Sequence, residues 1–428
     1  MLDLNLIREK PSEVEKALRK RMDNVDLSPL LSWDKQRREL ILESETMKAR
    51  RNKVSADIPR HKKEGLDVQA CLDEMKSVAE AIKGLEGKLA LVEEQIAACL
   101  AGLPNLPAED VLPGGKENNQ VVRTWGEKPQ FGFTPRDHME LAQSLGLIDY
   151  ERGVKLGGNG FWLYKGDGAL LEWALLNYFI TAHLADGYVF MLPPHILTYQ
   201  CGFTAGQFPK FTEDVFYLKA DEGKENEFFL LPTAETALIN VHRGEILAEE
   251  ELPKKYFSYT PCYRKEAGSY RARERGMIRG HQFNKVEMFQ YTKPEDSDQA
   301  LEELIAKAER LVQGLGLHYR VSKLAAMDCS ASMAKTYDIE IWIPSMNEYK
   351  EVSSASNARD YQARRGNIRF KRKETGRNEF IHTLNASGLA TSRLFPAMLE
   401  QFQKPDGSIT VPEALRKWVG KAVISKQD

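Results

Sequence analysis

Polar side chains gather in three parts of the chain, at places where strands are expected. Residues 231–235 contain a Thr-Ala-Glu tripeptide, and residues 262–287 contain an Arg-x-Glu sequence, an arginine-rich loop and a phenylalanine. Residues 351–354 and 382–393 add a glutamate, hydroxyl groups and Arg393. Together they offer arginines for phosphate oxygens, carboxylates for magnesium or an ammonium group, and an aromatic ring for a base.

Each of these segments alone has an ordinary structural explanation. Strands often end in polar residues, and a single Arg-x-Glu is more often a surface ion pair than a site. Two common nucleotide signatures are missing: no Gly-Lys is followed by Ser or Thr, and Gly158-Asn-Gly160 lacks the third glycine of a dinucleotide fingerprint. A nucleotide, if one is held, must therefore be held by other means.

The elements that would position these residues begin at about Val121. Short β-branched and aromatic runs alternate there with helical stretches such as residues 297–315. Strands within residues 253–290 follow one another through turns too short for crossovers, which favours an antiparallel sheet flanked by helices, an α+β fold. The strand candidates are residues 215–218, 228–231, 286–291 and 339–343.

A long helical hairpin is expected before this region, over about residues 30–100. From Val68 to Cys99 the apolar residues are spaced alternately three and four apart, as in a coiled coil, and Trp33 starts a weaker seam with a seven-residue repeat. Residues 59–65 break the pattern and supply a turn, and prolines and glycines at 104–115 end the second helix. We therefore predict an N-terminal domain over residues 1–112 and a larger domain over 113–428.

The two helices of the hairpin carry opposite charge. Residues 34–64 hold ten Lys or Arg against six Asp or Glu, whereas residues 67–100 hold three Lys against seven acids. Charge pairing between neighbouring helices explains this pattern as well as a basic ridge for phosphates does. The candidates for such a ridge include Arg37, Arg38, Arg50, Arg51 and Lys53.

Composition limits the remaining possibilities. A net charge of −2 argues against a protein that coats nucleic acid indiscriminately, so no DNA partner is expected. The five cysteines are scattered without a Cys-x-x-Cys pair, which argues against a disulfide framework and a cysteine-rich zinc site. No signal peptide or membrane span is recognisable, and a cytoplasmic location is expected.

The ordered motifs resemble those of class II aminoacyl-tRNA synthetases. Residues 260–291, with Arg264-x-Glu266 and Phe283, resemble motif 2, and residues 382–400 resemble motif 3. The apolar segment 169–194 resembles motif 1, which forms the dimer interface in that class. Within the class, three further sequences and the N-terminal arm resemble the bacterial type of the seryl-tRNA synthetase family: Thr233-Ala234-Glu235, Glu351-Val352-Ser353-Ser354 and Asn385-Ala386-Ser387-Gly388.

The resemblance implies specific residues for ATP. Arg264 would bind the α-phosphate and the substrate carboxylate, Phe283 would stack on adenine, and Arg393 would clamp the γ-phosphate and the leaving pyrophosphate. Glu351 and Ser354 would hold magnesium on the phosphates; Arg264, Glu351 and Arg393 are the implied catalytic residues. The full implied ATP set is Arg264, Lys265, Glu266, Phe283, Glu351, Val352, Ser353, Ser354 and Arg393.

The resemblance also implies a pocket for L-serine. Glu287 would take the ammonium and hydroxyl groups, Thr233 and Glu235 would line the pocket, and Thr383 and Ser387 would close it. The full implied serine set is Thr233, Ala234, Glu235, Arg264, Glu287, Thr383, Asn385 and Ser387. No protein nucleophile is needed, because the serine carboxylate attacks ATP and the tRNA hydroxyl then attacks the adenylate.

The implied activity is serine–tRNA ligation by a homodimer with ATP, Mg²⁺ and tRNA(Ser), without zinc; charging of tRNA(Sec) stays open. One alternative is a non-catalytic paralogue of the family that acts as an RNA-binding or regulatory module. A further one is a ligase that loads an amino acid onto a carrier protein, but such an enzyme should lack the arm, which is intact in this sequence. The chain departs from the family pattern at residues 355–360, which lack both usual cysteines, and at Ala205, Ala386 and Ser392. The loop 270–275 also departs from the family pattern, which bears on acceptor-stem contacts.

Overall fold

The computed structural model describes residues 1–65, 67–219, 228–266 and 276–426. The chain forms two compact units, residues 2–104 and residues 105–428. Among the described residues, no helix combines the length and the apolar character needed to cross a membrane.

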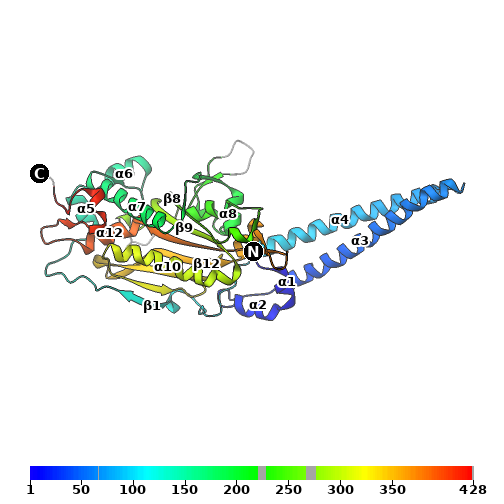
Figure 1. Ribbon diagram of the computed structural model, residues 1–428, viewed down its shortest axis with the longest axis horizontal. Coiled ribbons are helices and arrows are strands. Elements are labelled where there is room, and N and C mark those ends of the chain that lie inside the picture. Colours follow the sequence, from blue (N-terminus) through cyan, green and yellow to red (C-terminus); the bar gives the residue numbers. More distant parts are fainter. Residues whose placement is uncertain (66, 220–227, 267–275, 427–428) are drawn as a thin grey trace. The chain divides into compact units, whose positions relative to one another are not determined.

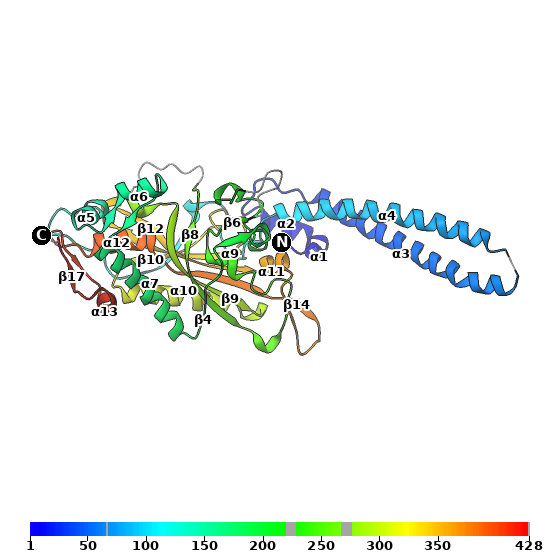
Figure 2. The ribbon, with the colours of Figure 1, turned by 90° about the horizontal axis from the view of Figure 1, so that it is seen from above.

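An eight-stranded sheet dominates the larger unit (Figures 1 and 2). Neighbouring strands are antiparallel, except that the last strand, β4, runs parallel to β8. The prediction of an α+β fold with a largely antiparallel sheet is therefore confirmed. In spatial order the strands are β1 (Gln120–Trp125), β10 (Tyr319–Lys323), β11 (Lys335–Ile343), β12 (Glu348–Arg359), β15 (His382–Ala390), β9 (Gln282–Thr292), β8 (Lys254–Tyr263) and β4 (Val189–Met191).

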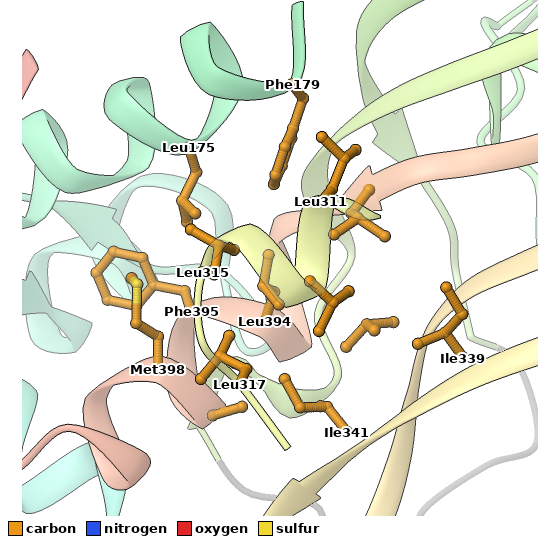
Figure 3. Close-up of a cluster of buried hydrophobic side chains, with 14 of the residues drawn as sticks. Leu175, Phe179, Leu311, Leu315, Leu317, Ile339, Ile341, Leu394, Phe395 and Met398 are labelled. Carbon is orange, nitrogen blue, oxygen red and sulfur yellow. The ribbon is translucent and has the colours of Figure 1, made fainter. Parts of the chain in front are cut away.

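Three helices bury their apolar residues on one face of this sheet (Figure 3). They are α7 (Asp167–Ala185), α10 (Ser297–Gly314) and α12 (Thr391–Gln401). Val286, Met288, Leu384 and Ala386 belong to the same apolar cluster. Because side chains alternate across a strand, the odd-numbered residues of β9 and β15 in this stretch face the opposite side, and that side carries the candidate site.

Smaller elements complete the unit. A three-stranded sheet joins β14 (Asn378–Phe380), β13 (Arg369–Lys371) and β7 (Ile246–Ala248). Three two-stranded sheets pair β2 (Ile148–Asp149) with β3 (Leu163–Tyr164), β5 (Ile196–Thr198) with β6 (Phe228–Leu230), and β16 (Ile409–Thr410) with β17 (Val423–Ile424). The shorter helices are α5 (His138–Ser144), α6 (Tyr150–Gly157), α8 (Tyr199–Ala205), α9 (Ala234–Leu238), α11 (Tyr361–Gly366) and α13 (Arg416–Val419).

The smaller unit is the expected helical hairpin, preceded by α1 (Leu4–Glu9) and α2 (Pro11–Leu18). Its long helices, α3 (Ser28–Lys63) and α4 (Gln69–Gly102), pack side by side (Figure 2). The seam predicted for the second helix is buried at Val78, Ile82, Leu85, Val92 and Ile96. The apolar spacing therefore located the contact between the helices.

Two local predictions are wrong. The turn between the long helices does not begin at Pro59, because α3 continues to Lys63 with Pro59 inside it. A proline removes one backbone donor, and a helix packed along its neighbour tolerates that loss close to its end. Residues 215–218 form no regular strand: Tyr217 makes only an isolated bridge to Phe229.

Candidate functional site

Neighbouring strands bring the predicted site residues together on the face opposite the helices. Phe283, Lys285 and Glu287 alternate along β9, and Glu287 lies directly opposite Ser387 of β15. Thr383, Asn385 and Ser387 alternate along β15 in the same way. Arg264 follows the end of β8, and Arg393 lies in the first turn of α12. Residues far apart in the sequence therefore meet at the middle of the sheet.

Three neighbouring hollows lie over this face and share several lining residues. The first is lined by Arg264, Glu266, Arg279, Phe283, Lys285, Glu351, Val352, Ser387 and Arg393, among others. The second, about 320 Å³, is bounded in part by Thr233, Arg264 and Arg279. The third, about 510 Å³, includes Arg279, Glu351, Ser354 and Arg393. Arg279 reaches all three, so cations and acids surround one connected region.

The arginines of the site are held by specific contacts. Arg264 donates from Nε to the carbonyl of Pro232 at 3.2 Å, and its guanidinium lies 5.3 Å from the ring centroid of Phe283. Arg393 donates from Nη1 to the carbonyl of Glu351 at 3.0 Å and to its Oε2 at 3.3 Å. These contacts fix the arginines but leave further N–H groups of each guanidinium available for phosphate oxygens.

Glu266 forms an ion pair with Arg279. Its backbone is left-handed, with φ 52°, a conformation that non-glycine residues adopt uncommonly. A strained backbone conformation persists only where the surrounding structure holds it in place, and such residues are often found at functional sites. Arg279 was missed by the sequence analysis, although it lies in the segment that resembles motif 2, four residues before Phe283.

A buried polar network surrounds Glu287, whose side chain is fully buried. The ammonium group of Lys285 pairs with Glu287 and donates to the hydroxyl of Thr233 at 2.6 Å. Asn385 donates from Nδ2 to Glu287 Oε1 at 3.1 Å, and the Thr233 hydroxyl lies 3.4 Å from Oε2. The structure thus brings the predicted residues Thr233, Glu287 and Asn385 into contact. Lys285 was missed, although the strand alternation that links Phe283 to Glu287 places it on the same face.

A second buried carboxyl group, that of Glu235, belongs to a separate chain of hydrogen bonds. Gln362 donates from Nε2 to Glu235 Oε1 at 2.6 Å and accepts from the Thr383 hydroxyl at 2.7 Å. Burial raises the pKa of Glu235 to about 7, the charge of Glu287 adds to the rise, and Gln362 opposes it. Gln362, from α11, links two predicted residues, and no pattern in the sequence pointed to it.

Carboxylates also cluster where magnesium was expected. Asp338 and Ser354 face each other across β11 and β12, and Glu340 pairs with Glu351 in the same ladder. Burial, followed by the charge of Glu351, raises the pKa of Asp338 well above its usual range. Oδ1 of Asp338 has no hydrogen-bond partner among the described residues. No three carboxylate, histidine or cysteine side chains among the described residues are grouped so that they could hold a metal ion by themselves, so magnesium here would need phosphate oxygens as further ligands. Asp338 was not among the predicted residues.

Some predicted residues have structural surroundings instead. Ala234 packs in an apolar cluster, and Val352 belongs to the main core although it also borders the first hollow. The hydroxyl of buried Ser353 donates to the carbonyl of Ser387 at 2.5 Å. The Lys265 ammonium lies 6.0 Å from the ring of Phe216, and Lys265 is absent from the lining of the three hollows. Residues 270–275 lie outside the described residues.

Charged residues of the hairpin form ion pairs both between its two long helices and within one helix. Arg37 pairs with Glu93 at 3.1 Å and Arg50 with Glu74 at 2.5 Å, both across the two helices, while Arg38 pairs with Asp34 of its own helix at 3.1 Å. Charge pairing between the helices is thus confirmed for Arg37 and Arg50. Arg51 and Lys53 make no ion pair with any described residue at these distances.

Comparison with known proteins places the chain. Residues 1–107 match the seryl-tRNA synthetase N-terminal domain, and residues 216–402 match the class II core domain of the G, H, P, S and T tRNA synthetases. Serine–tRNA ligase 2 of Clostridium acetobutylicum is 66% identical over 98% of this chain and 99% of its own. The chain belongs to the seryl-tRNA synthetase family. The predictions of family, of class II fold and of an enzyme, serine–tRNA ligase, are confirmed.

Other relatives agree. The serine–tRNA ligase of Syntrophobacter fumaroxidans is 46% identical over 98% of this chain and 99% of its own. The Pyrococcus horikoshii seryl-tRNA synthetase complexed with ATP superposes with a TM-score of 0.93 at 33% identity, covering all of both chains. The cytoplasmic Naegleria fowleri enzyme with AMP gives a TM-score of 0.88 at 27% identity over 100% and 99% of the two chains. Nothing in these matches supports the non-catalytic alternative.

Proposed function

We propose that this chain activates L-serine with ATP to form seryl-adenylate and pyrophosphate, and then transfers serine to the 3′ end of tRNA(Ser). One observation carries the proposal: Arg264, Arg279 and Arg393 border the first hollow together with Lys285 and Ser387, and these two residues lie beside the buried carboxylate of Glu287. A phosphate-binding wall and an ammonium-binding wall on one sheet face suit the condensation of an amino acid with a nucleotide.

For adenylate formation we assign roles to four residues. Arg264, beside both the first and second hollows, neutralises the α-phosphate and the serine carboxylate. Arg393 holds the outgoing pyrophosphate, Phe283 stacks on adenine, and Glu266 orients the base. The serine carboxylate attacks the α-phosphorus in line, the bond to the β-phosphate breaks, and no side chain is acylated. Catalysis is then positioning plus charge stabilisation.

The acidic side of the site suits ATP with bound magnesium, and MgATP is therefore the form of the substrate that we expect. Glu351 and Ser354 are the residues we expect to hold the metal, and Asp338 is close behind them in the β11–β12 ladder. Magnesium would supply positive charge that offsets the negative charge of the phosphates. The scattered cysteines give no reason to assign a role to zinc.

For serine selection we assign the ammonium group to Glu287 and Glu235 and the hydroxyl group to the network that includes Thr383. A pocket that hydrogen-bonds a substrate hydroxyl rejects the analogue without it by about 10⁴-fold, because its buried groups are left unpaired. Alanine should therefore be a very poor substrate. Threonine is excluded by the extra methyl group, for which the buried network leaves little room.

We assign tRNA binding to α3 of the hairpin, and we expect its Lys and Arg residues to contact the phosphate backbone of the tRNA rather than its bases. Contacts of this kind are salt-sensitive and read shape more than sequence. Arg51 and Lys53 are the best candidates, because Arg37 and Arg50 already pair with acids of α4 and Arg38 pairs with Asp34. The arm would serve tRNA charging and not amino-acid activation.

We also propose a homodimer that uses the exposed side of α7. Leu170, Trp173 and Leu184 are 48%, 53% and 52% exposed, and their spacing puts them on one side of the helix. Val189, 54% exposed, lies on β4 at the edge of the large sheet. Apolar residues gathered in this way usually mark an association surface. Light scattering should give twice the chain mass, and Trp173→Glu should shift it toward the monomer.

ATP–pyrophosphate exchange tests the activation step. Serine, threonine, alanine and glycine are supplied one at a time, with MgATP. Exchange should be strongest with serine and lower by about 10⁴-fold with alanine. Absence of serine-dependent exchange in a folded preparation would exclude the proposed function, and stronger exchange with another amino acid would change the substrate.

A further inference from the structure

We propose that Glu172 of α7 is a positioning residue for the ATP side of the site, acting through Asn284 and Thr391. Its carboxylate does not border any of the three hollows described above. The inference rests on the proposed function, because the residues that it would position are those assigned to ATP.

Glu172 is a polar residue in the core. Its exposed fraction is 3%, its neighbours Leu171, Ala174 and Leu175 are buried, and they belong to the main apolar cluster. A buried carboxyl group is costly unless it is hydrogen-bonded, so its retention in an apolar helix face needs an explanation. Burial raises the pKa of this carboxyl to about 7, and the hydrogen bonds from Thr391 and Asn284 oppose the rise.

One oxygen of Glu172 joins two separate elements. Asn284 of β9 donates from Nδ2 to Oε1 at 2.8 Å, and the hydroxyl of Thr391 donates to the same oxygen at 2.6 Å. The Thr391 hydroxyl also lies 3.1 Å from the carbonyl of Asn284. The side-chain carbonyl oxygen of Asn284 is also hydrogen-bonded, because the hydroxyl of Tyr259 donates to Oδ1 at 3.2 Å. Asn284 and Thr391 are thereby tied to each other and to α7.

Both partners of Glu172 are next to residues that line the first hollow. Asn284 lies between Phe283 and Lys285, and the strand alternation sends their side chains to the opposite face of the sheet. Thr391 is the first residue of α12, two positions before Arg393. A shift of Asn284 would therefore move the ring assigned to adenine, and a shift of Thr391 would move the arginine assigned to the γ-phosphate.

A second polar residue of α7 contacts a strand that carries site residues. Buried His183, also on α7, lies with Nε2 2.8 Å from the carbonyl of Gly388, which follows Ser387 on β15. Burial lowers the pKa of His183 to about 4, so the ring is neutral and Nε2 must carry the proton that the carbonyl accepts. α7 thus presents its apolar residues Leu170 and Trp173 on one side and polar supports for the site on the other.

The serine side of the site has its own supports. Glu235, Thr383 and Gln362 are bonded to one another and not to Glu172. Asn284 is also next to Lys285 of the serine network, but Lys285 is fixed by its own contacts with Glu287 and Thr233. If Glu172 acts by positioning, its loss should therefore affect ATP more than serine. A general loss of packing would lower stability and affect both substrates together. This difference separates a positioning role from a merely structural one.

The test compares Glu172→Gln and Glu172→Leu in ATP–pyrophosphate exchange with the full chain, with KM measured for each substrate. Glutamine keeps an oxygen that can accept both hydrogen bonds, so this variant should stay close to the unaltered chain. Leucine removes the acceptor, and KM for ATP should rise about tenfold or more, because a displacement of ~1 Å at a reacting group can cost 10²-fold. KM for serine should stay within about twofold.

A matched control is Glu309→Leu. Glu309 of α10 is another buried glutamate of the same unit, hydrogen-bonded to Arg123 and Tyr319, and none of these residues lines the three hollows. It should lower the melting temperature and leave both KM values unchanged. If Glu172→Leu does not fold, Thr391→Val removes one of the two hydrogen bonds at nearly constant volume and should raise KM for ATP by about threefold.

The inference is overturned if KM for ATP is unchanged in Glu172→Leu and Thr391→Val, if both KM values rise equally, or if Glu172→Gln is as defective as Glu172→Leu. The unaltered chain separates these outcomes from failure of the proposed function. Without serine-dependent exchange in that chain, the proposed function itself fails; with normal exchange and unaffected variants, only the role of Glu172 fails.

Discussion

Replacing Lys285 with methionine tests how the buried network of the serine pocket is balanced. The side chains of Lys285 and Glu287 are 7% and 0% exposed, and they form an ion pair. Methionine has a similar volume but no charge, so the Glu287 carboxylate would keep only Asn385 at 3.1 Å and the more distant Thr233. Removing one partner of a buried pair costs about 3–5 kcal/mol, because the remaining charge stays out of water.

The hollow beside Lys285 admits solvent, so we expect the lower end, about 3 kcal/mol in the free energy of unfolding by urea. Lys285→Met with Glu287→Gln should recover much of this loss, since no charge is then buried alone. The matched control is Lys254→Met on β8, whose ion pair with Glu251 lies at the surface, with the two side chains 19% and 43% exposed, and should contribute only about 0–1 kcal/mol. A loss below about 1 kcal/mol for Lys285→Met, or strictly additive losses in the double variant, would refute this reasoning.

Two further predictions concern serine binding and the arm. Burial raises the pKa of Glu235 to about 7, so its carboxyl is neutral below that pH and charged above it; kcat/KM for serine should rise with pH up to about 7 and then level off, and Glu235→Gln should abolish this rise. Deleting residues 30–100 should spare exchange and abolish tRNA charging, whereas an equal loss of both would contradict the division of labour. Within the arm, Lys53→Glu should weaken charging at moderate salt more than Lys35→Glu, whose ammonium lies 3.9 Å from Glu39.

The periodic parts of the fold were predictable because their signals are local. The three- and four-residue spacing from Val68 to Cys99 located the buried seam of α4. The first part of the apolar segment 169–194 lies in α7, which extends over Asp167–Ala185. Pro59 misled the prediction, because a proline weakens a helix locally while the packing of α3 against α4 is spread over many turns.

The candidate site was predictable where motifs placed residues on one strand face, and less so where tertiary packing added a neighbour. Thr383, Asn385 and Ser387 follow from strand alternation once β15 is known. Gln362 lies on α11, and no local sequence pattern predicts that its side chain joins Glu235 to Thr383. Buried groups whose role is to hold other residues depend on distances between distant segments, which a single sequence does not contain.

Glu172 shows the same difficulty. In the sequence it is a charged residue within the apolar segment 169–194, and this position gave no reason to connect it with the site. In the folded chain it accepts hydrogen bonds from Asn284 and Thr391, which precede Lys285 and Arg393 by one and two residues. The connection becomes visible only when β9, α7 and α12 are packed together.

The most direct test of the central claim is transfer of labelled serine to purified tRNA(Ser), with MgATP and the full chain. Label should accumulate on the tRNA 3′ end, remain sensitive to mild base as an ester, and require ATP. Arg264→Ala, which removes the proposed contact to the α-phosphate and the serine carboxylate, should lower the rate by on the order of 10²-fold or more. Charging of tRNA(Ser) with another amino acid, or none with a folded chain, would contradict the account.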